Sequence, residues 1–171
     1  PGPEKPPGGF GLPLEEKTIS EVLKDQGYRT GMVGKWHVGS ENGRRPFERG
    51  FESFFGFLGG AHPYYTRPKQ LPIFRMSNQV NESTYLTDAF AREAASFISA
   101  GDARPFFLYL PFNAVHAPLE APESDTAKFG KLKGDRKTFA GMLSALDRAV
   151  GTVTEALRKS GQDKNTLIVF L

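Results

Sequence analysis

Three times along the chain, an amphipathic helical pattern is followed within a few residues by a short apolar run. The helical patterns cover residues 18–26, 84–99 and 135–160, and the apolar runs cover residues 29–33, 105–110 and 166–171. Strands that are apolar on both faces and alternate with helices are typical of a parallel sheet covered by helices. Because crossovers between parallel strands are right-handed, the carboxyl ends of the strands meet at one edge, where open α/β folds bind ligands. The sequence therefore predicts a largely parallel α/β fold with its site at that edge.

Local signals mark the boundaries of this pattern. Thr18 and Glu21 have the spacing of a capping box, and Gly27 stands where a left-handed residue ends a helix. By contrast, residues 39–81 show no periodicity and are rich in glycine, arginine and aromatic residues. This stretch is long for a plain connection, so we expect a functional loop there.

Composition excludes several classes of protein. The 171 residues carry 22 Lys+Arg against 19 Asp+Glu, a net charge of +3, with the two signs interspersed. No run of basic residues indicates binding to nucleic acid, and no apolar stretch is long enough for a transmembrane helix. The chain has 0 cysteines, so it has no disulfide, no thiolate nucleophile and no cysteine-based metal site.

Two basic side chains follow the first predicted strand. Lys35 and His37 lie two residues apart, with Gly34 before them and Gly39 after them. In an extended segment, residues two apart point the same way, so both side chains would reach one ligand. An ammonium beside an imidazole suits an anion such as sulfate, phosphate or carboxylate. The alternative is a strand end with a solvated lysine and a histidine bonded to a backbone carbonyl.

A second histidine loop follows the second apolar run. His116 comes shortly after Leu110, which places it at the same edge of the predicted sheet as Lys35 and His37, and Pro118 stiffens the exit from the loop. This shared edge makes His116 a candidate for the same anion site.

The aperiodic stretch contains a third histidine, His62, close to two tyrosines at 64 and 65. These rings would line a substrate pocket, since sugar and aryl rings stack on tyrosine. In the alternative interpretation, the loop packs on the sheet through its own aromatic side chains.

Other charged residues offer weaker candidates. Arg44, Arg45 and Arg67 would recognise further anionic groups of a substrate, or they are solvated loop charges. Asp125 and Asp135 have no partner at the spacing of metal ligands, so we predict no metal site in this segment.

Three stretches of the chain resemble one known family. Residues 27–39 resemble the second signature of the sulfatases, Gly-Tyr-x-Thr-x-x-x-Gly-Lys-x-His, at every defined position. Residues 49–57 resemble the Gly-Phe-x-x-Phe-x-Gly-Phe stretch that often follows it, and residues 113–118 resemble the later histidine loop of the family. The order and spacing agree over nearly the whole chain, from about residue 14 to residue 171.

This resemblance implies an alkaline-phosphatase-like α/β fold, incomplete in this segment, and the hydrolysis of aryl or carbohydrate sulfate esters. In the family, the hydrate of a formylglycine residue attacks sulfur, and a divalent metal, usually calcium, holds the sulfate. Carried over by position, Lys35 would bind the sulfate and the formylglycine side chain. His37 would hydrogen-bond the formylglycine hydroxyl and help to release sulfate, and His116 would contact the sulfate near the leaving oxygen as a ligand and proton donor. The resemblance also implies export to the periplasm, the lysosome or the medium.

The chain lacks the sequence motif that carries the nucleophile in this family. It contains no cysteine and no Ser-x-Pro-Ser-Arg sequence. We therefore interpret residues 1–171 as the central part of a sulfatase catalytic domain, truncated at both ends, and expect this segment alone to be inactive. Two alternatives stay open: a phosphomonoester or phosphonate hydrolase of the same superfamily, and a non-catalytic anion-binding relative.

Overall fold

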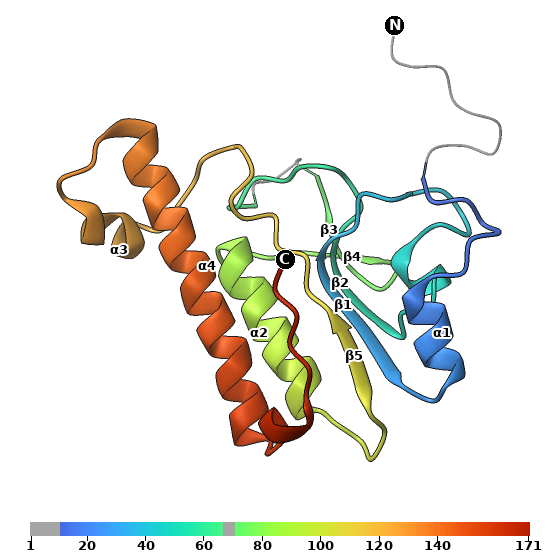
Figure 1. Cartoon of the computed structure of the whole chain (residues 1–171). Helices are drawn as coiled ribbons and strands as arrows, with labels where there is room; N and C mark the ends of the chain where they lie inside the picture. The colour runs from blue at the N-terminus through green and yellow to red at the C-terminus, as the bar shows by residue number, and fades with distance from the viewer. Residues whose placement is uncertain (1–10, 67–70) are drawn as a thin grey trace, which may run out of the picture.

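The structure is a computed structural model, described here for residues 11–66 and 71–171. Within these ranges, one sheet has the strand order β4-β3-β2-β1-β5 (Figure 1). The strands are β1 (Arg29–Lys35), β2 (Ser53–Phe57), β3 (Ile73–Arg75), β4 (Asn78–Val80) and β5 (Phe106–Tyr109). Strand β1 pairs in parallel with both β2 and β5, whereas β3 is antiparallel to β2 and to β4. The sheet is therefore mixed, with the predicted parallel arrangement at its centre.

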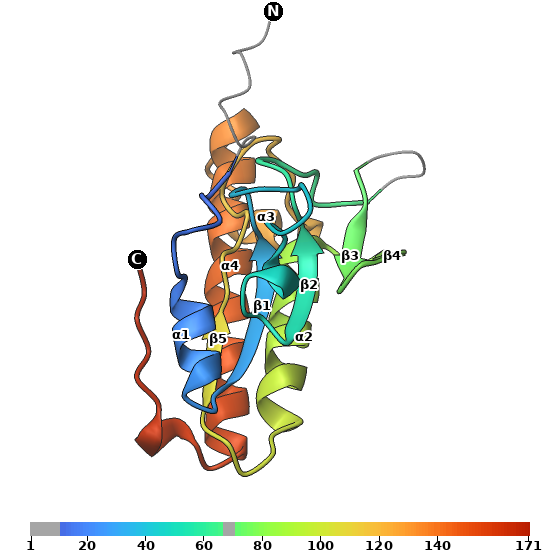
Figure 2. The same ribbon diagram turned by 90° about the vertical axis from the view of Figure 1, so that its right-hand side faces the viewer.

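Helices cover both faces of the sheet. The α-helices are α1 (Ile19–Asp25), α2 (Leu86–Ser99), α3 (Glu123–Thr126) and α4 (Gly134–Lys159), and the 3-10 turns are η1 (Pro46–Glu48), η2 (Ala127–Phe129) and η3 (Asp163–Asn165). Helix α2 packs on one face with α4 alongside it, and α1 lies on the other face (Figures 1 and 2). No helix in the described part of the chain is long and apolar enough to cross a bilayer.

The first helix begins as its sequence predicts. Thr18 Oγ1 accepts a hydrogen bond from the Glu21 amide at 3.2 Å, and Glu21 Oε2 accepts one from the Thr18 amide at 2.6 Å. This capping box is confirmed, and Gly27 follows the helix with φ +83°. The local signals thus fix where the chain turns into β1.

Each face of the sheet has its own core. The face toward α2 buries seven residues, Val33, Phe55, Phe57, Ile73, Leu86, Ala89 and Phe90. The other face buries Met32, Trp36, Phe51 and Phe54. The ring centroids of Trp36 and Phe51 are 6.1 Å apart, and the two ring planes are nearly perpendicular. Successive residues of β1, Met32 and Val33, thus pack into opposite cores, as expected for a central strand.

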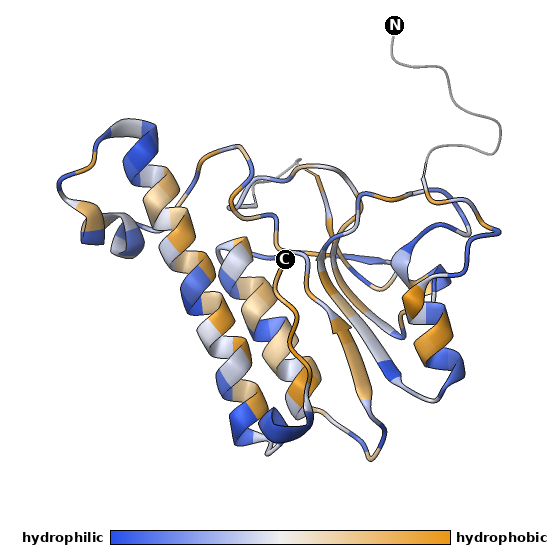
Figure 3. Cartoon of the chain, in the orientation of Figure 1, coloured by the Kyte–Doolittle hydropathy of each residue, from blue (hydrophilic) through white to orange (hydrophobic). Residues whose placement is uncertain are grey.

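Two expectations about strands are wrong. Residues 39–81, predicted to be a long loop, contain β2, β3 and β4. Residues 166–171, predicted to be a strand, form no strand, and Leu167 and Phe170 are 88% and 75% exposed. A strand needs a hydrogen-bonded neighbour, and none of the described segments pairs with these residues. Figure 3 shows them as an apolar segment without regular structure.

A buried carboxylate joins α3 to α4. Asp125 is 0% exposed and accepts hydrogen bonds from Arg148 Nη1 at 2.5 Å, Lys128 Nζ at 2.8 Å and Ser144 Oγ at 3.0 Å. Arg148 also contacts Asp88 of α2 at 2.9 Å. Burial opposes the charged form of Asp125, but these donors outweigh it and lower the pKa of the carboxyl to about 2. Asp125 therefore holds helices α3, α4 and α2 together, directly and through Arg148.

We predict that Asp125→Asn destabilises the full-length protein by about 2–3 kcal/mol at pH 7, which is the free-energy equivalent of the lowered pKa. Since the folded pKa lies below the unfolded value of about 3.9, the contribution is complete above about pH 5 and is lost as the pH falls toward 2. In thermal unfolding measured from pH 7 to pH 3, the difference in melting temperature between Asp125→Asn and the wild type should become smaller as the pH falls. Asp147→Asn, at an exposed position of α4, is the control. An equal gap at every pH would contradict this account.

Candidate functional site

The chain leaving β1 is bonded to the segments that follow both neighbouring strands. The Lys35 amide donates to the Pro111 carbonyl at 2.9 Å, beyond the end of β5. The Trp36 and His37 amides donate to the carbonyls of Phe57 and Leu58, at 3.0 and 3.2 Å, where β2 ends. Three loops thus meet at the carboxyl edge of the parallel strands, which is the edge that the sequence predicts for ligand binding.

Lys35 is the last residue of β1, and its side chain is partly buried. Among the described residues its ammonium has no carboxylate partner, although most other basic side chains near the sheet are paired. A partly desolvated ammonium without a counter-ion is favourably placed to bind an anion.

His37 does not continue the strand. Its side chain is exposed and its φ is +58°, so the assumption of an extended segment from Lys35 to His37 is wrong. The strand ends at Lys35 because the next two amides bond to the β2 side, and the chain then turns. In the described part of the chain, neither ring nitrogen of His37 has a hydrogen-bond partner, so both stay available for a ligand.

His116 lies in the loop after β5 and is exposed. Its Nδ1 lies 2.7 Å from the Ala117 carbonyl, which can only accept, so Nδ1 carries the proton of that bond. The other nitrogen, Nε2, has no partner among the described residues. An imidazole held in this way presents one ring nitrogen to a substrate, as a general acid or base requires.

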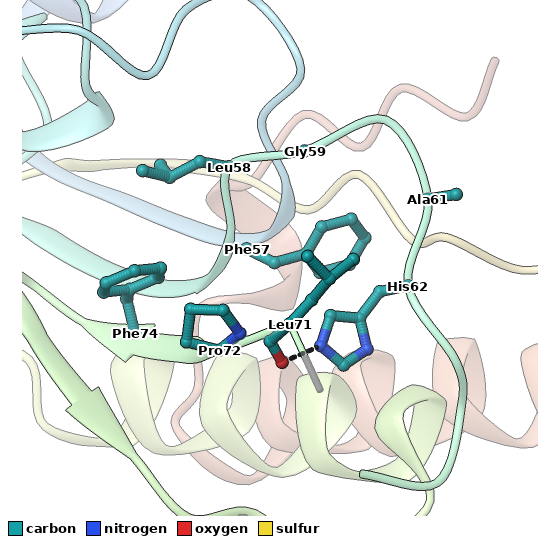
Figure 4. Close-up of a pocket in the computed structure, with 8 residues that line it drawn as sticks. All are labelled: Phe57, Leu58, Gly59, Ala61, His62, Leu71, Pro72 and Phe74. Atoms are coloured by element: carbon teal, nitrogen blue, oxygen red, sulfur yellow. Dashed lines mark hydrogen bonds between the residues drawn. The ribbon is translucent and has the colours of Figure 1, made fainter. Parts of the chain in front are cut away.

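His62 occupies a different position from the other two histidines. It is 1% exposed, and one ring nitrogen lies 2.6 Å from the Pro63 carbonyl. The other lies 2.8 Å from the Leu71 carbonyl, a bond that Figure 4 shows. With both nitrogens bonded, the ring offers no free nitrogen to a ligand. His62 holds the Leu71 end of its loop, and its predicted contact with substrate stays a prediction.

Beside His62 is a cavity of about 200 Å³ (Figure 4). It is lined by Phe57, Leu58, Gly59, Ala61, His62, Leu71, Pro72 and Phe74. The lining is almost entirely apolar, so this cavity offers no group that would hold a sulfate.

Tyr64 and Asn113 join the loops after β2 and β5. The Tyr64 hydroxyl lies 2.8 Å from the Asn113 carbonyl and 2.9 Å from the His116 carbonyl, and Asn113 Nδ2 donates to the His62 carbonyl at 3.3 Å. Burial raises the pKa of Tyr64 far above its ordinary value, so the hydroxyl remains a donor. In the sequence, Tyr64 is marked only by its position two residues after His62, which predicts a ring for stacking and gives no sign of the hydroxyl contacts.

We predict that Tyr64→Phe lowers the stability of the full-length protein by about 2 kcal/mol, because two buried carbonyls lose their donor. Tyr65→Phe is the matched control, since the Tyr65 hydroxyl has no hydrogen bond within the described ranges. The shift in melting temperature of each variant measures the effect. Equal melting temperatures for the two variants would show that the Tyr64 hydroxyl contributes nothing.

The two described arginines of the aperiodic stretch, Arg44 and Arg45, differ in their burial and in their hydrogen-bond partners. Arg44 is 6% exposed and its guanidinium bonds to the Leu12 carbonyl, so it is not the solvated loop charge considered above. Arg45 contacts Asn42 at 2.9 Å on the surface, and Arg67 lies outside the described residues. No group of three or more His, Cys, Asp or Glu residues in the described ranges has the arrangement of a metal site. The side chains present therefore do not fit a calcium ion.

Comparison with known proteins gives a consistent family. The family model described as Sulfatase matches residues 2–171. The chain is 34% identical to Arylsulfatase J of Mus musculus, over 93% of this chain and 29% of that protein. It is 30% identical to the Arylsulfatase of Klebsiella aerogenes, over 95% of this chain and 48% of that protein.

A solved structure is also similar. The crystal structure of Ps i-CgsB in complex with k-i-k-neocarrahexaose superposes with a TM-score of 0.86 at 40% identity, covering 89% of this chain and 38% of that one. The chain thus spans less than half the length of each of these three relatives.

Proposed function

This chain belongs to the sulfatase family, and we propose on that basis that the protein containing it hydrolyses sulfate esters. The observation that carries the proposal is the unpaired ammonium of Lys35 at the carboxyl edge of the sheet, with His37 and His116 in the loops on either side. All three side chains are donors or proton carriers, which suits a tetrahedral dianion.

The chemistry of the reaction fits these groups. Cleavage of the sulfur–oxygen bond leaves negative charge on the departing oxygen, and a positioned acid that protonates this oxygen lowers the barrier. We assign this role to Nε2 of His116, which donates its proton from the doubly protonated ring while Nδ1 keeps the proton of its bond to the Ala117 carbonyl. Lys35 neutralises charge on the sulfate oxygens, and His37 contacts the same anion from the loop after β1.

The nucleophile and the metal belong to the finer part of the proposal. We propose a formylglycine hydrate as nucleophile and calcium as the divalent metal, both held by parts of the protein beyond these 171 residues. Their support is the family resemblance alone, because the described residues supply neither a precursor sequence nor a set of metal ligands. Export from the cytoplasm is a proposal with the same support.

For the substrate we favour a carbohydrate sulfate ester over a small aryl ester. The support is the 40% identity to Ps i-CgsB, whose crystal structure contains k-i-k-neocarrahexaose. A surface loop that carries His116 beside the open edge of the sheet is accessible to a long oligosaccharide.

The test uses the full-length protein with calcium and three substrates: a sulfated galactan oligosaccharide, 4-nitrophenyl sulfate and 4-nitrophenyl phosphate. Release of inorganic sulfate from either sulfate ester, well above release of phosphate, supports the proposal. Preferential release of phosphate would instead identify a phosphomonoester hydrolase. If calorimetry shows that the protein binds sulfate but none of the three substrates is hydrolysed, the protein is a non-catalytic anion-binding relative.

A further inference from the structure

The loop that follows β2 lies directly against the side chain of His37. A Cβ atom built on Gly60 would lie 2.4 Å from His37 Nε2, 2.6 Å from Cε1 and 3.0 Å from Cδ2. Carbon atoms of real side chains do not approach this closely, because the repulsion at such distances exceeds any packing gain. With a side chain at residue 60, the imidazole could not keep this position, and the exposed ring of His37 would be the part that moves.

Few other contacts orient the His37 ring. The side chain is exposed, and within the described ranges neither ring nitrogen has a hydrogen-bond partner. The backbone of His37 is fixed by its φ of +58° and by its amide bond to the Leu58 carbonyl at 3.2 Å. A histidine with a fixed backbone and no ring hydrogen bond is oriented by packing, and the Gly60 backbone forms part of the packing surface here.

We propose that Gly60 is a positioning residue for His37. Its backbone forms a wall on one side of the imidazole and limits the directions in which the ring nitrogens face the anion bound at Lys35. Gly60 takes no part in the chemistry itself. The kinetic consequence rests on the proposed function, whereas the effect on the ring of His37 does not.

The neighbouring glycine provides a matched control. Neither Gly59 nor Gly60 has a φ in the left-handed region, so alanine is compatible with the backbone at both positions. A Cβ on Gly59 would find its nearest neighbour, the Ala61 carbonyl oxygen, at an ordinary 3.9 Å. Both substitutions remove the same freedom from the unfolded chain, so a difference between them reports the contact with His37.

The kinetic experiment compares Gly60→Ala, Gly59→Ala and His37→Ala in the full-length protein. We expect Gly60→Ala to lower kcat about 10- to 50-fold, since a misplaced catalytic group costs up to about 100-fold, while KM stays within about 2-fold. Gly59→Ala should match wild type. In the double variant with His37→Ala, the Gly60 substitution should cause no further loss, because the ring that it displaces is gone. Equal kcat values for the two glycine variants, or additive losses in the double variant, would overturn the proposal.

A second readout is independent of turnover. Diethyl pyrocarbonate acylates a ring nitrogen of accessible histidines, and peptide mass spectrometry gives the rate for His37 alone. Gly60→Ala should change this rate at least 3-fold relative to wild type and Gly59→Ala, and an unchanged rate would count against the proposal. If the wild-type protein hydrolyses no sulfate ester, the proposed function fails while this rate still decides the role of Gly60.

Discussion

Replacing Lys35 by methionine in the full-length protein is expected to lower kcat/KM for sulfate esters by about 10²–10³-fold, the usual cost of removing one preorganised charge or donor from a transition state. Methionine retains the apolar length of the side chain, so the fold around β1 should be preserved. The strand end keeps its amide bond to the Pro111 carbonyl, which does not depend on the side chain. Steady-state kinetics with 4-nitrophenyl sulfate measure the loss.

Two further lysine variants sharpen this prediction. Lys131→Met removes an exposed lysine from the loop before α4 and should leave kcat/KM unchanged. Lys35→Arg retains the charge but not the compact ammonium, so an intermediate loss is expected. If Lys35→Met were as active as Lys131→Met, the anion would have to bind elsewhere.

The second large effect concerns the backbone beneath Lys35. Gly34 has φ +133°, and a Cβ on it would lie 2.1 Å from the Pro111 carbonyl oxygen, the atom that accepts the Lys35 amide. Alanine at this position cannot avoid both the strained φ and the clash with backbone atoms. We therefore expect Gly34→Ala to destabilise the full-length protein by about 4 kcal/mol or more, or to prevent folding, because strain and overpacking add.

Two other glycines calibrate this effect in the same melting experiment. Gly27→Ala shares a positive φ, +83°, but a Cβ there meets nothing within 4 Å, so the cost should be about 1–2 kcal/mol. Gly151→Ala lies in open space inside α4 and should stabilise by about 1 kcal/mol. If the Gly34→Ala and Gly27→Ala proteins had the same melting temperature, the loop at Pro111 would have moved aside to accommodate the new Cβ.

Sequence periodicity predicted helices α1, α2 and α4 and strands β1 and β5 because their signals are local. The capping box of α1 and the apolar faces of α2 and α4 are contained within single segments. Strand β2, Ser53–Phe57, is buried at four successive positions, one of which is Gly56, so its sequence shows neither a period of two nor one of 3.6. Strands β3 and β4 have three residues each, too few for any pattern.

The site was predicted unevenly for a related reason. Lys35 and His116 follow strands, and topology alone places them at one edge of the sheet. The burial of His62 could not be predicted because it depends on carbonyls at residues 63 and 71, whose positions follow from tertiary packing. The contact of Gly60 with His37 has no sequence signal at all, since it joins two loops whose paths are set by β1 and β2.

The pairing of β1 with β5 has a kinetic consequence. In their register Arg29 lies opposite Phe106, so the strand that ends at Lys35 and the strand that leads to His116 are far apart in sequence. Closing such a long loop costs entropy before any contact repays it, and chains rich in distant contacts fold slowly. During refolding, affinity for sulfate should therefore develop only after the helices have formed. The rate at which this affinity returns would report the rate at which β1 pairs with β5.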